Sequence, residues 1–129
     1  MGPNKEKKPV KTYRDLNVYK QSFEMAFQVF CATKEFPAEE RYGLTDQVRR
    51  AARSIPTNIA EGWAKRKYEN VFKRHLLDSV GSCEEVKVWL EMAHRCGYLD
   101  KARCADLLLS YAEIGSMLSS LLERWKSYS

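Results

Sequence analysis

The chain has 129 residues, the length of one domain, and its composition of 44% hydrophobic and 30% charged residues is ordinary for a globular protein. No apolar run approaches the ~20 residues of a membrane span, and residues 1–12 lack the apolar segment of a secretory signal. These features argue against a membrane protein and predict a cytoplasmic one. We expect a disordered basic tail over residues 1–12 and one helical domain over residues 13–129.

The first predicted helix begins near Leu16 and ends near Phe36, because Pro37 disfavours helix in the residue before it. Two apolar rows run along it at helical spacing. We expect the first row to form the core, and the second either to widen that core or to be buried between subunits. The first row is Leu16, Tyr19, Phe23, Ala26 and Phe30, and the second is Val18, Met25, Val29 and Ala32.

The second predicted helix runs from about Thr45 to Glu61, and Gly62 is suited to end it as a C-terminal cap. Pro56 lies inside this helix. It removes one backbone donor and crowds the carbonyl of Ala52, so we expect a kink. Hydroxyl and amide side chains nearby are expected to satisfy the freed carbonyl. They are Ser54, Thr57 and Asn58.

The third predicted helix runs from about Tyr68 to Cys96, followed by Gly97 as a left-handed C-cap, and Asp100 is a suitable N-cap for the fourth. Short connections between long amphipathic helices favour antiparallel neighbours. The sequence therefore predicts an all-α fold, an antiparallel up-down four-helix bundle. The expected core rows are Phe72, Leu76, Ser79, Cys83, Val86, Leu90 and Ala93, and then Leu107, Tyr111, Ile114, Leu118, Leu121 and Trp125.

Apolar residues also lie outside these rows, more than one core stripe per helix requires. Some of them would widen the core, and the rest indicate surface that is buried between subunits. We therefore expect the chain to associate with itself. These residues are Trp63, Tyr68, Val71, Val88, Trp89, Met92, Cys104, Leu108 and Leu122.

A polar row steps by three and four along the second helix, beside its apolar row. Such a row is usually a solvated face. Because Arg50 and Glu61 carry opposite charges and have small polar residues between them, the row also suits a network against another helix or chain. We interpret it as structural rather than catalytic. The residues expected to support the bundle or the oligomer are Gln47, Arg50, Ser54, Pro56, Asn58, Glu61 and Gly62.

Catalytic and metal-binding patterns find little support in the sequence. His75 and Asp78 are three residues apart, which could orient an imidazole, but no nucleophile pairs with them. The four cysteines include no C-x-x-C pair, which favours buried thiols over a zinc site. We expect no enzymatic activity, no cofactor and no metal.

The stretch LTDQVRRAARSIPTNIAEGWAKR, residues 44–66, resembles the signature of a bacterial four-helix-bundle family first noted as proteins encoded in ribosomal RNA intervening sequences. The resemblance extends through DLNVYKQSFEMA, FPAEERYG, GSCEE and CGYLD, and so covers nearly the whole chain. Relatives of this family include the accessory variability determinant proteins of diversity-generating retroelements.

The resemblance implies a homopentamer, five bundles arranged as a barrel around a central channel, with no catalytic site. For the retroelement relatives it implies a basic protein that binds nucleic acid and a reverse transcriptase, and that supports cDNA synthesis. For the intervening-sequence relatives it implies no assigned function.

The net charge of +5 is unevenly distributed, since residues 47–75 hold eight basic residues and two acids. Five-fold repetition of this cluster would favour phosphate backbones. Without a base-reading motif, we expect weakly selective binding to RNA or DNA. The predicted binding residues are Arg49, Arg53, Lys65, Arg66, Lys67, Lys73 and Arg74, and the alternative site is the N-terminal tail with Lys5, Lys7, Lys8 and Lys11.

Two functions stay open at this point. The first is an oligomeric nucleic-acid-binding scaffold that acts as accessory subunit of a retroelement reverse transcriptase. The second is a structural or protein-interaction oligomer whose basic patch docks an acidic protein.

Overall fold

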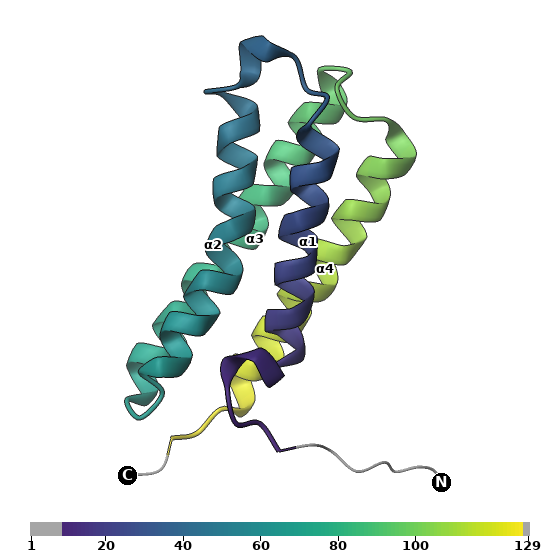
Figure 1. Ribbon diagram of the computed structural model, residues 1–129. Helices are drawn as coiled ribbons and strands as arrows, with labels where there is room; N and C mark the ends of the chain where they lie inside the picture. Colours follow the sequence, from purple (N-terminus) through teal and green to yellow (C-terminus); the bar gives the residue numbers. More distant parts are fainter. Residues whose placement is uncertain (1–8, 128–129) are drawn as a thin grey trace, which may run out of the picture.

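The computed structural model describes residues 9–127, which form four long antiparallel helices that run up and down side by side (Figure 1). The predicted all-α four-helix bundle is confirmed. The long helices are α1 (Asn17–Thr33), α2 (Leu44–Ala64), α3 (Glu69–Arg95) and α4 (Lys101–Arg124), and the short 3-10 helices are η1 (Tyr13–Asp15) and η2 (Ala38–Glu40).

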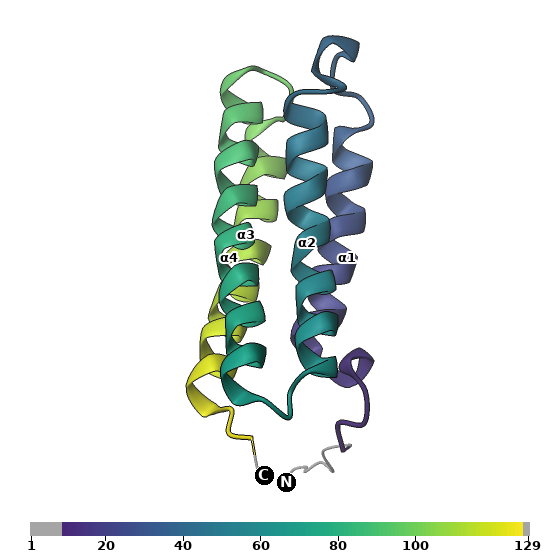
Figure 2. The same ribbon diagram turned by 90° about the vertical axis from the view of Figure 1, so that its left-hand side faces the viewer.

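Each long helix packs against two neighbours. α2 contacts α1 and α3, and α4 contacts α3 and α1, so α1 and α3 lie at opposite corners of the bundle. The turned view shows the same antiparallel arrangement, with η1, the α2–α3 turn and the end of α4 at one end (Figure 2). Within residues 9–127, no helix combines the length and the apolar character needed to cross a bilayer.

The core is formed by one buried row from each long helix. On α3 the buried row matches the prediction at every position, from Phe72 to Ala93. On α4 the row is buried from Leu107 to Leu118, whereas Leu121 and Trp125 are half-buried. Cys104, expected outside the core row, is buried as well.

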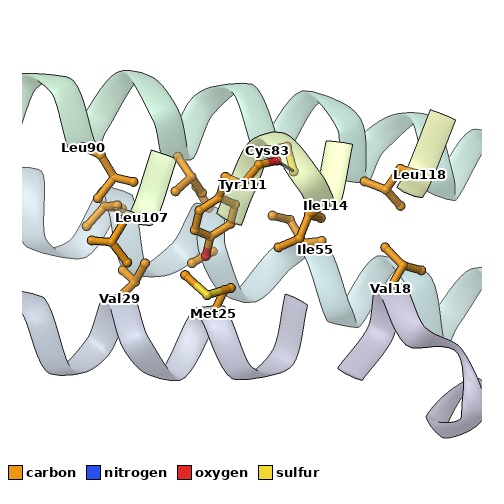
Figure 3. Close-up of a cluster of buried hydrophobic side chains, with 14 of the residues drawn as sticks. Val18, Met25, Val29, Ile55, Cys83, Leu90, Leu107, Tyr111, Ile114 and Leu118 are labelled. Atoms are coloured by element: carbon orange, nitrogen blue, oxygen red, sulfur yellow. Dashed lines mark hydrogen bonds between the residues drawn. The ribbon is translucent and has the colours of Figure 1, made fainter. Parts of the chain in front are cut away.

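The prediction for α1 was wrong about which row is buried. Val18, Met25 and Val29 face the core, whereas the side chains of Phe23 and Phe27 are 59% and 54% exposed. The reason is volume. Tyr111 of α4 is fully buried and reaches across the bundle toward α1, with its ring near Met25 and Val29 (Figure 3). Opposite so large a side chain, α1 places its smaller row in the core. Of the predicted first row only Phe23 is exposed, whereas Leu16, Tyr19, Ala26 and Phe30 are half-buried.

The two helix ends at the α3–α4 turn were predicted well, whereas the end of α1 was not. Gly97 has φ +84° and follows α3 as its left-handed cap, and the Asp100 carboxylate accepts a hydrogen bond of 2.7 Å from the backbone N–H of Arg103 at the start of α4. By contrast, α1 ends at Thr33, three residues before Phe36. The Thr33 hydroxyl donates back to the Val29 carbonyl at 2.8 Å and to the Phe30 carbonyl at 3.1 Å, so it satisfies one of the carbonyls left open at the end of the helix.

Candidate functional site

The signature segment forms α2 and its junction with α3. The prediction that Gly62 ends this helix was wrong, because α2 continues to Ala64 and Gly62 is buried within its last turn. A Cβ on Gly62 would lie 2.7 Å from the Cβ of His75 and 3.0 Å from Cδ1 of Phe72. Glycine is therefore needed here for the close approach of α2 to α3, not for its backbone freedom.

The middle of the polar row connects α2 to α3. The Ser54 and Ser82 hydroxyls lie 2.6 Å apart, and Oδ1 of Asn58 lies 3.0 Å from Nδ1 of His75. Nε2 of His75 lies 3.4 Å from Nζ of Lys65. An ammonium group can only donate, so Nε2 is the acceptor and Nδ1 carries the proton that is donated to Asn58. His75 is thus oriented by α2, and not by Asp78 as the spacing had suggested.

The ends of the polar row are in contact with solvent. Gln47 and Glu61 are exposed, and Arg50 forms an exposed ion pair of 3.1 Å with Asp46, one turn earlier on the same helix. Within one subunit, the network that was expected to link Arg50 to Glu61 is therefore limited to Ser54 and Asn58. A role for the exposed members between subunits stays a prediction.

Pro56 is buried, and the ribbon of α2 changes direction near the middle of the helix (Figure 1). The polar side chains around it do not bond to the carbonyl that was expected. Ser54 donates to the carbonyl of Ala51 at 2.7 Å, Thr57 to that of Arg53 at 3.0 Å, and Asn58 to that of Ser54 at 3.0 Å. These carbonyls flank the proline site, and the carbonyl of Ala52 is not among them.

Pro56 also lines an apolar groove between α1 and α2, with a volume of about 570 Å³. We call it the α1–α2 groove. Its walls include the aromatic residues of α1 that the core leaves outside. The main contributors are Phe23, Phe27 and Phe30 from α1, and Arg53, Pro56 and Ala60 from α2.

The seven predicted nucleic-acid-binding residues do not form one patch. Arg49 and Lys65 are 16 residues apart, or roughly 24 Å along α2. Arg49 is half-buried, and its Nε donates to the Thr33 hydroxyl at 2.7 Å, with its guanidinium 4.7 Å from the centre of the Phe30 ring. It therefore joins α1 to α2. Arg53 is exposed beside the α1–α2 groove.

The other five residues lie around the α2–α3 turn. Two of them are held by neighbours, since Arg66 donates to the Trp63 carbonyl at 3.0 Å and stacks on the Trp63 ring, while Lys73 pairs with Glu69 at 3.1 Å. The remaining three are exposed. They are Lys65, Lys67 and Arg74.

The fold brings four further basic residues to the α2–α3 turn, of which the sequence had assigned only Lys11, to the alternative site in the N-terminal tail. Because the helices run up and down, residues 9–16, 61–75 and 123–127 meet at the same end of the bundle, which we call the basic end (Figure 2). The C-terminal segment is tied to the α2–α3 turn, where the Ser127 hydroxyl donates to the Arg66 carbonyl at 2.6 Å. The up-down topology was the signal that could have predicted this grouping. The added residues are Lys11, Arg14, Arg124 and Lys126.

The basic end contrasts with the other end of the bundle. Its three segments carry nine basic and four acidic residues, whereas residues 33–46 and 93–103 at the opposite end carry five of each. The charge of the bundle is therefore polarised along its long axis. Lys5, Lys7 and Lys8, the rest of the alternative site, lie outside the described residues.

The cysteines differ in burial. Cys83 and Cys104 are buried, whereas Cys31 is half-buried and Cys96 is exposed, so the expectation of buried thiols holds for two of the four. Burial raises the pKa of the Cys83 thiol to about 11 and makes it a poor nucleophile at neutral pH. Within residues 9–127, no three His, Cys, Asp or Glu side chains are grouped so that they could hold a metal ion.

Comparisons with known proteins identify the family. A crystal structure of a protein of unknown function from the S23 ribosomal protein family of Bacteroides thetaiotaomicron is similar, with a TM-score of 0.73 and 21% identity. The match covers 82% of this chain and 98% of the other, and it supports the fold. No curated protein sequence matches the chain. The sequence matches the 23S rRNA-intervening sequence protein family over residues 14–120, so the chain belongs to this family.

Proposed function

We propose that the protein is a non-enzymatic, oligomeric scaffold that binds RNA or DNA through the phosphate backbone. The observation that supports this function best is the polarised charge of the bundle, with nine basic and four acidic residues at the basic end and an equal number of each at the other. Phosphate contacts provide affinity without reading sequence, which agrees with a site that lacks any base-reading motif.

Lys65, Lys67 and Arg74 are the main phosphate ligands in this proposal. All three are exposed, and none has an ion-pair partner within residues 9–127. Arg66 and Lys73 contribute positive charge but keep their contacts to Trp63 and Glu69. Arg49 is assigned to packing between α1 and α2, and Arg53 to the groove.

The oligomer in this proposal is the homopentameric barrel that the family resemblance implies. If the subunits are parallel, the basic ends gather on one rim of the ring, which multiplies the field that attracts nucleic acid. Light scattering at micromolar concentration should give about five times the subunit mass of 15.0 kDa. A monomer over that range would refute the assembly.

The binding experiment compares two variants with the same change of charge. The first replaces Lys65, Lys67 and Arg74 by Gln at the basic end, and the control replaces Arg41, Lys101 and Arg103 by Gln at the opposite end. All six side chains are exposed. Each is titrated against a single-stranded RNA and a DNA duplex of mixed sequence, at about 50 and 200 mM salt.

We expect the basic-end variant to bind both nucleic acids more weakly. The slope of the logarithm of the binding constant against the logarithm of the salt concentration should be smaller in magnitude by about 2–3 for each subunit in contact. The control should bind like the wild type. Absence of binding by the wild type at low salt would refute the function and favour an acidic protein partner. Equal loss in both variants would show that net charge matters and the basic end does not.

A retroelement reverse transcriptase is the protein partner that we propose with this function. It rests on the resemblance to the accessory variability determinant proteins. A gene for a reverse transcriptase beside this gene, with template and variable repeats, would support the assignment. A neighbourhood without these elements would remove the reverse transcriptase and leave the nucleic-acid-binding function to be judged by the titration.

A further inference from the structure

The α1–α2 groove exposes an aromatic surface that the subunit itself does not cover. The side chains of Phe23 and Phe27 are more than half exposed, and Phe27 stacks on Phe30 with ring centroids 6.3 Å apart. The groove is bordered by cations. Lys34 directly follows α1, with its Nζ 5.1 Å from the centre of the Phe30 ring, and Arg53 is exposed on α2. A partner for this groove should be apolar along its centre and acidic at its edges.

The exposed face of α3 has those properties. Leu77, Val88 and Met92 are 58%, 52% and 47% exposed. With Gly81 they follow one another at intervals of four, seven and four residues, so they lie on one outward face about 22 Å long. We call these four residues the α3 row. Between Leu77 and Met92, four acidic residues accompany the row against one base, Lys87, while the exposed Arg74 and Arg95 lie one turn beyond its two ends. The acidic residues are Asp78, Glu84, Glu85 and Glu91.

Gly81 adds an independent indication that something packs on the α3 row. A glycine inside a helix costs about 1 kcal/mol relative to alanine. The glycine at position 62 is explained within the subunit, because a Cβ there would collide with α3. No such explanation applies to Gly81, because a Cβ built on it would have no atom within 4 Å. The same is true of Gly115 on α4, but only Gly81 is exposed and lies between exposed large apolar side chains. An exposed helical glycine next to large apolar side chains provides a place where another backbone can approach closely.

We propose that the α1–α2 groove of one copy receives the α3 row of a second copy. This inference rests on the oligomer of the proposed function and names the two surfaces that form its interface. α1 and α3 lie at opposite corners of the bundle, so each copy can offer its α3 row while its own groove is occupied. Such a head-to-tail contact generates a closed ring when the rotation between copies divides a full turn.

The groove is better suited to a helix than to single-stranded nucleic acid. A stacking platform presents separate aromatic faces to successive bases. Here Phe27 is stacked on Phe30, and Tyr19 packs edge-to-face on Tyr13 with ring centroids 4.9 Å apart, so these rings already contact one another along the wall. The chain also supplies its own complementary surface, apolar and acidic, on α3.

A mixing experiment distinguishes this interface from any other. The groove variant carries Phe23→Glu and Phe27→Glu, and the row variant carries Gly81→Glu and Val88→Glu. Both introduce acids, so the two altered surfaces cannot pair with each other. The control is Leu109→Glu on α4, where a leucine 64% exposed lies outside both surfaces. Masses are measured by light scattering at micromolar concentration, and circular dichroism checks folding.

We expect each variant alone to be monomeric at 15.0 kDa, and an equal mixture to form a dimer of twice that mass, joined through the one intact pair of surfaces. The control should keep the mass of the wild type. If a variant does not fold, the milder variants Phe27→Ser and Val88→Ser are used instead. Light scattering should then show that each needs a protein concentration at least tenfold higher than the wild type to assemble.

The outcomes separate this inference from the proposed function. A monomeric wild type would refute the oligomer and the interface together. A wild-type oligomer whose mass either variant retains, or a mixture that stays monomeric, would overturn the interface alone. A groove variant that keeps the wild-type mass but loses binding to the single-stranded RNA would also overturn it, and would assign the groove to nucleic acid.

Discussion

Nδ1 of His75 lies 3.0 Å from Oδ1 of Asn58, and this contact joins the signature segment of α2 to α3. Both side chains are half-buried. The Asn58 amide nitrogen donates in turn to the Ser54 carbonyl, and the Ser54 hydroxyl contacts Ser82 at 2.6 Å. The asparagine thus fixes the orientation of α3 relative to the bent part of α2, which gives a structural reason for a polar residue beside an apolar row.

The Asn58–His75 contact should be measurable as a coupling energy. We expect Asn58→Ala to lower the free energy of unfolding by about 1–2 kcal/mol, because the half-buried imidazole loses its acceptor. The double variant with His75→Ala should be less destabilised than the sum of the single variants, by about 0.5–1.5 kcal/mol. Urea unfolding of the four proteins gives these values.

Asp78→Ala is the control, because Asp78 is exposed and should change stability by less than about 0.5 kcal/mol. Strict additivity of Asn58→Ala and His75→Ala would show that the contact contributes nothing.

Two helical glycines should respond in opposite ways to alanine. Gly62→Ala places a Cβ 2.7 Å from the Cβ of His75, so α2 and α3 must separate, and we expect a loss of about 1–3 kcal/mol. Gly115→Ala meets no atom within 4 Å and should gain up to about 1 kcal/mol from helix propensity. Thermal melts of both variants test this contrast, and a neutral or stabilising Gly62→Ala would contradict the close approach.

Periodicity predicted the helices and most of the core, because burial on α2, α3 and α4 follows a single dominant apolar row. It failed on α1, which has two apolar rows of similar quality. Hydrophobicity favours the aromatic row with Phe23, but opposite Tyr111 the core takes the smaller row with Val18 and Val29. That choice depends on a residue about 85 positions later in the chain, so no local pattern contains it.

The candidate site was predicted only in part, for a similar reason. Three basic residues are adjacent in sequence and stay together at the basic end, namely Lys65, Arg66 and Lys67. Arg49 was grouped with them by sequence, but it packs on Thr33 and Phe30 far along the helix. Lys11 and Lys126 join the basic end because antiparallel helices return the chain there. Topology, rather than composition, decides which charges share a surface.

The lowered pKa of the Glu69 carboxyl leads us to expect that the stability of the fold depends on pH. The backbone N–H of Ser127 and the ammonium of Lys73 hold the pKa of this carboxyl below its ordinary value of 4.5. Since the folded state favours the ionised form, the stabilisation is complete above pH 4.5 and is lost as the pH falls through the lowered pKa. Glu69→Gln should therefore melt below the wild type at pH 7, with a difference that shrinks as the pH falls below 4.5.

Lys73→Gln removes one of the two contacts and leaves the Ser127 N–H, so it should show a smaller part of the same loss. A melting difference between wild type and Glu69→Gln that stays constant from pH 7 to 3 would contradict this account of Glu69.

The hydroxyl of Tyr111 has no hydrogen-bond partner within residues 9–127, although the side chain is fully buried. Burial also raises the pKa of this phenol, as expected for a group that cannot be solvated. An unpaired buried hydroxyl costs about 1–3 kcal/mol, and phenylalanine retains the ring that fills the core opposite Met25. We therefore expect Tyr111→Phe to raise the melting temperature by about 2–5 °C.

Tyr98→Phe is the matched control, because it removes the same atom from a hydroxyl that donates to the Glu40 carboxylate at 3.0 Å. This variant should melt at a lower temperature than the wild type, so one chemical change gives opposite signs at two positions. Differential scanning calorimetry of the two variants at equal concentration measures both. A lower melting temperature for Tyr111→Phe would mean that the hydroxyl does have a partner, and a buried water molecule is the group that such a site would hold.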